Sequence, residues 1–205
     1  MSSEKKSLRA AEQDRPDVKE RREAWREQVK EWDRRRLIFI DESGAKTNMT
    51  RRYGRCFGGQ RVVDATPHGH WCTTTMISAL RCDGRTTDMV IEGATDADAF
   101  RTYVERILAP TLRPGDMVVM DNLAPHKMPA VVAAIEALGA RAIFLPPYSP
   151  DFNPIEKMWS KIKAYLRMAK ARTKEILWQA IGAALNTVTA SDALGWFEAC
   201  GYTRA

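Results

Sequence analysis

The order of short apolar runs and helical patterns constrains the fold of this chain more than any other feature. Five runs rich in β-branched, aromatic and other apolar residues are typical of strands, and they span residues 37–40, 73–80, 88–91, 116–120 and 142–145. Helical patterns follow the third, fourth and fifth runs and begin at Thr95, Pro129 and Ile155. Three strands followed by strand–helix units predict an α/β fold with a mixed five-stranded sheet flanked by helices.

The composition changes abruptly at Leu37. Residues 1–35 are rich in Glu, Arg, Lys and Gln and hold few apolar side chains, which is typical of an exposed helical linker or arm rather than a core element. The length of 205 residues fits one domain of ordinary size plus such an extension. We therefore expect a helical linker or arm over residues 1–35 and one folded domain over residues 36–205.

The distribution of apolar and charged residues also limits the possible functions. No run approaches 18 apolar residues, and the N-terminus lacks the apolar stretch of a signal peptide, so we expect a cytoplasmic protein with no membrane partner. The net charge of +6 is concentrated in two segments: residues 46–61 hold five basic and no acidic side chains, and residues 141–175 hold eight basic and three acidic ones. These segments indicate an anionic partner, although solvated surfaces produce similar runs.

Three carboxylates fall at positions that suggest a metal site. We expect Asp41 to end the first strand, Asp121 to end the fourth, and Glu156 to open the helix after a proline-rich loop. The first and fourth strands can be neighbours in a mixed sheet, and the stiff loop can direct Glu156 back over its edge. Clustered carboxylates repel one another unless a cation such as Mg²⁺ or Mn²⁺ neutralises them. Taken singly, each acid is more typical of a turn, a cap or the first turn of a helix than of a functional site.

The segments around these acids resemble a known family. FIDES (39–43), VVMDNLAPHK (118–127) and LPPYSPDFNPIEKMWSKIK (145–163) are similar to the three acidic motifs of DDE transposases, in particular the insertion-sequence-630 group related to mariner elements. The 34 residues between Asp121 and Glu156 match the interval of that group, and the resemblance covers residues 8 to 205. It implies a ribonuclease-H-like catalytic domain in which Asp41, Asp121 and Glu156 hold two Mg²⁺ or Mn²⁺ ions.

The resemblance also implies a reaction and partners. The expected reaction is hydrolytic nicking at transposon ends, followed by attack of the freed 3′-hydroxyl on target DNA at a TA dinucleotide, without a covalent protein–DNA intermediate. Such proteins normally carry an N-terminal helix-turn-helix region, whereas this sequence begins at the linker. We therefore expect an upstream helix-turn-helix partner or frameshift-fused region, a homodimer on DNA, and association with the nucleoid.

Two other functions remain open at this stage. The chain could be a catalytically silent DNA-binding or dimerisation remnant of a degenerate insertion element. It could also be an RNA-cleaving enzyme of the ribonuclease H type, which shares the acids but lacks the proline-rich third motif.

Other residues are candidates for supporting roles. Asn122 and His126 could position Asp121 or a phosphate, or simply cap their loop. Trp159 is expected to anchor its helix in the core. The candidates for binding DNA phosphates are the basic side chains that follow or lie within the three motifs, namely Arg51, Arg52, Arg55, Lys127, Lys157, Lys161 and Lys163.

Overall fold

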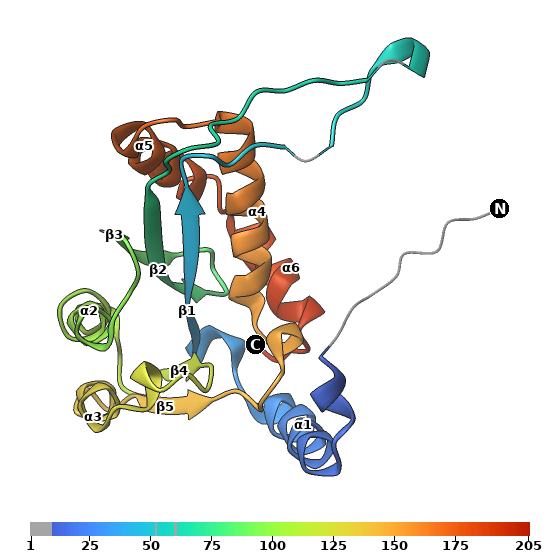
Figure 1. Cartoon of the computed structure of the whole chain (residues 1–205). Coiled ribbons are helices and arrows are strands. Elements are labelled where there is room, and N and C mark those ends of the chain that lie inside the picture. The colour runs from blue at the N-terminus through green and yellow to red at the C-terminus, as the bar shows by residue number, and fades with distance from the viewer. Residues whose placement is uncertain (1–9, 52, 60) are drawn as a thin grey trace.

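The computed structural model describes residues 10–51, 53–59 and 61–205, and in them the chain forms a five-stranded sheet with the order β3-β2-β1-β4-β5. The strands, drawn in Figure 1, are β1 (Leu37–Lys46), β2 (Thr73–Arg81), β3 (Thr86–Glu92), β4 (Met117–Met120) and β5 (Arg141–Phe144). Strand β2 is antiparallel to both β1 and β3, whereas β4 is parallel to both β1 and β5. The mixed sheet and the adjacency of the first and fourth strands agree with the sequence prediction.

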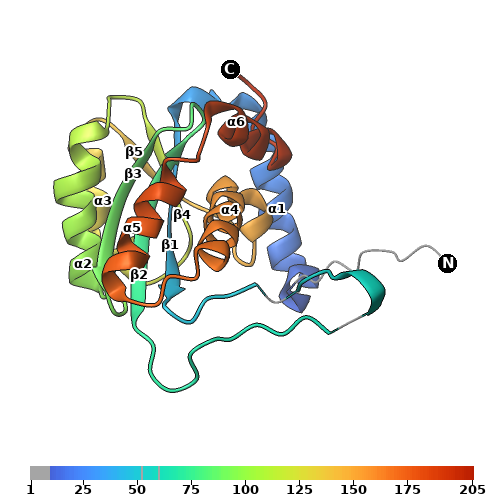
Figure 2. The same ribbon diagram turned by 90° about the horizontal axis from the view of Figure 1, so that it is seen from above.

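Helices cover both faces of the sheet (Figure 2). One face carries α4 (Pro154–Ala169), α5 (Lys174–Leu185) and α6 (Ala190–Ala199), and the other carries α2 (Ala97–Thr102) and α3 (Pro129–Glu136). A π-helix, Tyr103–Leu108, continues α2. Short 3-10 turns connect these elements at Ala11–Asp14, Val29–Glu31, Arg34–Arg36, Phe57–Gly59, Ala109–Thr111, Pro125–Lys127 and Pro150–Phe152. None of the helices in the described residues is long and apolar enough to cross a bilayer.

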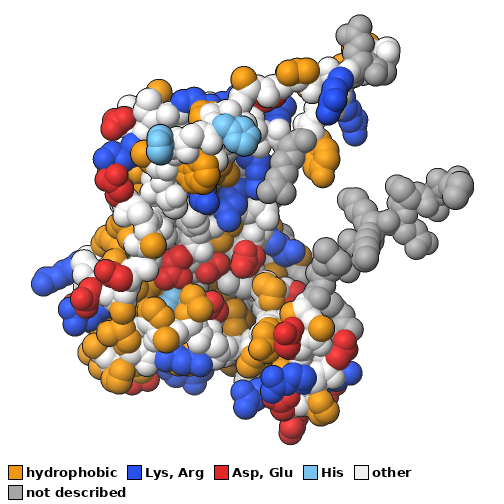
Figure 3. All heavy atoms as spheres, viewed as in Figure 1, with side chains coloured by type: hydrophobic (Ala, Val, Ile, Leu, Met, Phe, Trp, Pro, Cys, Tyr) orange, Lys and Arg blue, Asp and Glu red, His pale blue; other side chains and the backbone are white. Residues whose placement is uncertain are grey.

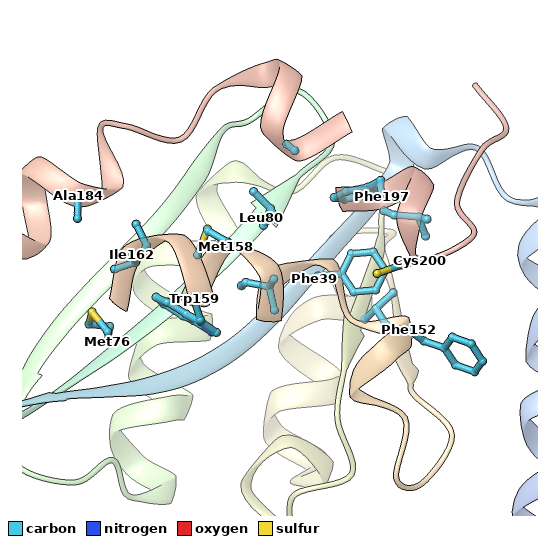
Figure 4. Close-up of a cluster of buried hydrophobic side chains, with 14 of the residues drawn as sticks. Phe39, Met76, Leu80, Phe152, Met158, Trp159, Ile162, Ala184, Phe197 and Cys200 are labelled. Carbon is cyan, nitrogen blue, oxygen red and sulfur yellow. The ribbon is translucent and has the colours of Figure 1, made fainter. Parts of the chain in front are cut away.

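The larger part of the core lies between the sheet and α4 (Figure 4). Side chains alternate between the faces of β1, so Phe39 enters this part, whereas Ile38 and Ile40 enter the part under α2 and α3. The ring of Phe39 meets Phe197 edge-on with centroids 5.2 Å apart. Trp159 is fully buried here, which confirms it as a core anchor of α4.

Two element boundaries differ from the sequence prediction. Asp41 does not end the first strand: β1 pairs with β2 from Ile38 to Lys46, and Asp41 lies opposite Ser78 in the middle of this ladder. The strand continues because the long β2 supplies a partner for every residue of the Asp-Glu-Ser-Gly segment that looks like a turn. The helix α2, which follows β3, begins one residue later than expected. Its N-cap is Asp96 rather than Thr95, because the carboxylate of Asp96 accepts a hydrogen bond from the backbone N–H of Ala99 at 2.7 Å.

The helix α1 (Pro16–Gln28) lies within the segment expected to be helical, and one face of it is buried. Val18, Trp25 and Val29 are buried, and Trp25 is only 5% exposed. Its Nε1–H donates to the hydroxyl of Tyr202 at 3.1 Å, and its ring meets Trp32 edge-on. These apolar residues recur at helical spacing, so they form one narrow stripe that the charged composition conceals. The boundary near residue 36 remains a prediction.

The burial of α1 can be tested by stability. We expect Trp25→Ala to lower the free energy of unfolding by about 3–5 kcal/mol, because a large buried ring leaves a cavity. Trp178→Ala, which removes an indole that is 40% exposed on α5, should cost less. Urea unfolding measures both variants, and equal losses would show that α1 contributes little to the core.

Candidate active site

Three acidic side chains meet at a cavity of about 530 Å³ beside the carboxyl ends of β4 and β5. Asp41 comes from the middle of β1, Asp121 directly follows β4, and Glu156 lies in the first turn of α4. The cavity wall includes all three acids and the proline-rich loop between β5 and α4. Figure 3 shows acidic side chains gathered near the middle of this face, with basic side chains above them. The structure therefore brings together the three acids that the sequence singles out.

The carboxyl of Asp41 has a strongly raised pKa. Burial and the nearby charge of Glu156 raise this pKa to about 7, although the backbone N–H of Glu42, which donates to Oδ1 at 2.8 Å, partly opposes the rise. Like charges in a poorly solvated site favour protonation of one of them. The crowding of carboxylates expected from the sequence is thus present around Asp41.

Asp121 is held by a buried histidine. Nδ1 of His126, whose side chain is 0% exposed, lies 2.6 Å from Oδ1 of Asp121, but the ring N–H is not aligned with that oxygen, so the contact is mainly electrostatic. On the other side of the ring, Nε2 lies 3.1 Å from Oε2 of Glu42. Burial lowers the pKa of His126, but the two carboxylates, Asp121 and Glu42, have the larger combined effect and raise this pKa to about 9.

The pairing with His126 keeps Asp121 ionised. Burial works against ionisation, yet the imidazolium and the backbone N–H of Leu123, which donates to Oδ1 at 2.9 Å, lower the pKa of Asp121. The sequence prediction that His126 positions Asp121 agrees with this geometry, whereas the role of Glu42 was missed. The signal was available: Glu42 follows Asp41 in a strand, so it points to the opposite face, where the loop after β4 packs.

Asn122 contacts the loop that leads to Glu156. Its side-chain amide donates to the carbonyl of Leu145, at the end of β5, rather than contacting Asp121. Asn122 therefore ties the loop that carries Asp121 to the start of the proline-rich loop that leads to Glu156.

The donor set fits a divalent metal ion chemically. Carboxylate oxygens are the ligands that Mg²⁺ and Mn²⁺ prefer, and a cation would offset the repulsion that raises the pKa of Asp41. In the described residues, however, no three His, Cys, Asp or Glu side chains are arranged to hold an ion as they stand. The contacts of Asp121 with His126 and with the backbone N–H of Leu123 both involve Oδ1, and Asp121 also lines the cavity.

The basic candidates on α4 separate into different environments. Lys157 is exposed and Lys163 is half-buried. Lys161 is not a free cation: its Nζ donates to the carbonyl of Thr187 at 2.7 Å and to Asp192 at 2.6 Å, so it joins α4 to the start of α6. Lys161, a candidate for binding DNA phosphates, is therefore paired within the protein, and its partners come from a distant part of the chain.

The remaining basic candidates lie on loops. Lys127 is exposed after β4. Arg51 and Arg55 are exposed in the long connection between β1 and β2, and Arg52 lies outside the described residues. Arg51 lines a hollow of about 500 Å³ together with Tyr53 and three residues of α4, namely Ala164, Arg167 and Met168. Sequence reasoning missed Arg167, although its spacing from Glu156 on the same helix places it on the same face.

Comparisons of the structure with solved structures show the fold. The chain is similar to the "Mos1 transposase paired-end complex with left transposon end" (TM-score 0.77, 15% identity, 98% of this chain and 64% of that chain). It is also similar to the "Structure of Mos1 transposase catalytic domain and Raltegravir with Mg" (TM-score 0.62, 15% identity, 96% of this chain and 92% of that chain). The fold is therefore ribonuclease-H-like, as in the Mos1 catalytic domain.

The shared lengths and the family model define the relationship further. This chain spans about 64% of the length of the transposase chain in the paired-end complex. No curated protein matches it in sequence. A family model described as "DDE superfamily endonuclease" matches residues 36–177, which include all three acids. Because this match covers well over half of the chain, the protein belongs to the DDE superfamily of endonucleases.

Proposed function

We propose that this chain is the catalytic domain of a DNA transposase of the insertion-sequence-630 group, which nicks transposon ends and joins the freed 3′-hydroxyl to target DNA at TA. The observation that carries the proposal is the convergence of Asp41, Asp121 and Glu156 on one cavity in a DDE endonuclease chain. Their arrival from three separate elements argues against three unrelated turn and cap residues.

The three acids would hold two Mg²⁺ or Mn²⁺ ions. Such ions activate an attacking oxygen and stabilise the leaving oxygen in phosphodiester chemistry. The protein's own contribution is to fix the ligands: His126, braced by Glu42, keeps Asp121 ionised, and the sheet holds Asp41 beside it. Solved structures of the mariner Mos1 paired-end complex with Mn and with Mg support this choice of ions.

DNA would follow the exposed face of α4. Lys163 and Arg167 lie on this helix beyond Glu156, and Arg51 joins Arg167 at the hollow with Tyr53. These cations could contact phosphates along a DNA strand, and the exposed ring of Tyr53 could stack on a base. Arg55, Lys127 and Lys157 are exposed and available to further phosphates.

The proposed partners follow from the same relationship. We propose that the chain acts as a homodimer on DNA in the nucleoid, together with a helix-turn-helix region that recognises the transposon ends. Support comes from its similarity to the Mos1 transposase paired-end complex with left transposon end.

The catalytic assignment predicts a loss of nicking. With terminal-repeat DNA, Mg²⁺ and a recognition partner, Asp121→Ala and Glu156→Ala should each lower the nicking rate more than about a hundredfold, since even residues that only support metal ligands cost 10–100-fold. Arg101→Ala, which removes a half-exposed side chain of α2 that does not line the cavity, should retain the wild-type rate. Full activity in either acid variant would refute the assignment. Salt-sensitive DNA binding without cleavage would instead favour the silent remnant, and hydrolysis of RNA–DNA hybrids would favour a ribonuclease.

The raised pKa of Asp41 predicts a pH dependence of stability in EDTA. Because this pKa is about 7 in the folded protein and 3.8 in the reference state, folded protein retains a proton that unfolded protein has released between these values. The stabilisation is complete below pH 3.8 and is lost as the pH rises through 7. The Tm should therefore fall from pH 5 to pH 8, by about 2–4 °C for each kcal/mol lost.

Asp41→Asn isolates this contribution. The variant should show a smaller fall in Tm over the same pH range, since the titrating carboxyl is gone while His126 and the other groups remain. Differential scanning fluorimetry of both proteins measures the difference. Parallel Tm curves for the two proteins would contradict the raised pKa.

The environments of Arg167 and Lys161 predict opposite effects on DNA binding. Arg167→Ala should weaken DNA binding and reduce the slope of log Kd against log salt by about 1, as expected for one lost phosphate contact. Lys161→Ala should leave that slope unchanged and lower the Tm, because its charge is already used by Asp192. Fluorescence anisotropy over a salt series checks this, and equal slopes in both variants would exclude the proposed track along α4.

A further inference from the structure

Arg22, in the middle of α1, is a buried cation that the catalytic assignment does not use. The residue is 7% exposed, and its guanidinium donates to both carboxylate oxygens of Asp151, at 2.9 and 2.7 Å. It also donates to the hydroxyl of Ser149 at 2.7 Å and stacks on the ring of Phe152, 4.4 Å from the centroid. A planar fork fits this combination of paired bonds and ring stacking, whereas an ammonium group does not.

All the groups that Arg22 contacts lie in the loop that leads to Glu156. Figure 1 shows α1 beside the connection from β5 to α4. The 3-10 turn Pro150–Phe152 holds two of the contacts, and only Asn153 separates this turn from Pro154, the first residue of α4. Glu156 lies in the first turn of that helix, so the position of the 3-10 turn determines where the carboxylate of Glu156 lies.

Two further contacts join the N-terminal segment and the chain end to the same loop. The side-chain amide of Gln13 donates to the carbonyl of Tyr148 at 2.6 Å. The hydroxyl of Tyr202, which accepts from Trp25 of α1, donates to the carbonyl of Phe152 at 2.8 Å. Tyr148 has a left-handed φ of 55°, a conformation that a non-glycine residue retains only when its surroundings impose it. The loop is thus held from the α1 side at successive residues.

The burial of Arg22 is hard to explain by stability alone. Taking a guanidinium out of water costs free energy that an ion pair only partly returns, and apolar side chains of similar size often stabilise such positions at least as well. The paired hydrogen bonds of the buried guanidinium add geometric specificity, because they hold the loop in one position.

We propose that Arg22 is a positioning residue for Glu156, acting through Asp151, Ser149 and Phe152, and that α1 and the proline-rich loop form one unit of the metal site. The proposal rests on the proposed function for the identity of the ion that Glu156 helps to hold. It makes α1 part of the catalytic apparatus without giving any of its residues contact with the reacting atoms.

Arg22→Lys tests the proposal because it keeps the charge and removes the fork. Amide hydrogen exchange over residues 153–157 of the metal-free protein should be faster than in the wild type. Mn²⁺ binding, followed by the EPR signal of the free ion, should weaken about tenfold, as for other residues that support metal ligands. Asp151→Asn should change both measurements in the same direction, and it supplies the test if Arg22→Lys fails to fold.

Arg81→Lys is the matched control. Arg81 is also a largely buried cation, 2.7 Å from Asp116, but this pair lies at the amino end of β4, away from Asp121. The control should lower the Tm as Arg22→Lys does, without changing exchange over residues 153–157 or Mn²⁺ affinity.

The outcomes separate this proposal from the proposed function. Unchanged exchange at residues 153–157 in Arg22→Lys, or Mn²⁺ affinity altered equally by the control, would overturn the positioning role. Absence of Mn²⁺ binding in the wild type would overturn the metal-dependent function, while the exchange comparison would still decide whether Arg22 holds the segment that carries Glu156.

Discussion

The repulsion between carboxylates at one edge of the sheet is the constraint on which the rest of this structure depends. Parallel pairing of β1 and β4 places Asp41 and Asp121 together, and the start of α4 brings Glu156 to the same cavity. The protein balances this charge unequally. The charge of His126 compensates that of Asp121, whereas burial and the neighbouring carboxylates raise the pKa of Asp41 to about 7. A divalent ion is the natural complement to such a site.

The helix α4 shows how one element serves both the core and the site. Its inner face carries Trp159 and packs against the sheet, which fixes the helix in place. Its outer face begins with Glu156 and continues to Arg167, so the acid and the proposed DNA contacts share one rigid support. The loop before the helix is less constrained by the sheet, and contacts with α1 supply the missing restraint. Burial of Trp25 anchors α1 itself.

How well the sequence predicts each element differs, and the differences have physical causes. Strands and helices with regular apolar spacing were predicted close to their observed positions, and so was the adjacency of the first and fourth strands. The end of β1 was misplaced because a partner strand can extend residues that favour turns. The burial of α1 was missed because three apolar residues among many charged ones give a weak pattern. Lys161 and Arg22 could not be judged from the sequence, since their partners lie far along the chain, whereas the alternation of side chains along a strand already places Glu42 on the face opposite Asp41.

The sequence by itself determined the mixed sheet, the three acids and their spacing, because local apolar patterns and motif residues are properties of short segments. Only the tertiary structure decided which charges are available and which are already paired. It assigned Lys161 to Asp192, His126 to Asp121 and Glu42, and Arg22 to the loop before Glu156. The physical reason is that charge pairing and burial depend on distances between segments, which packing sets and local sequence does not encode.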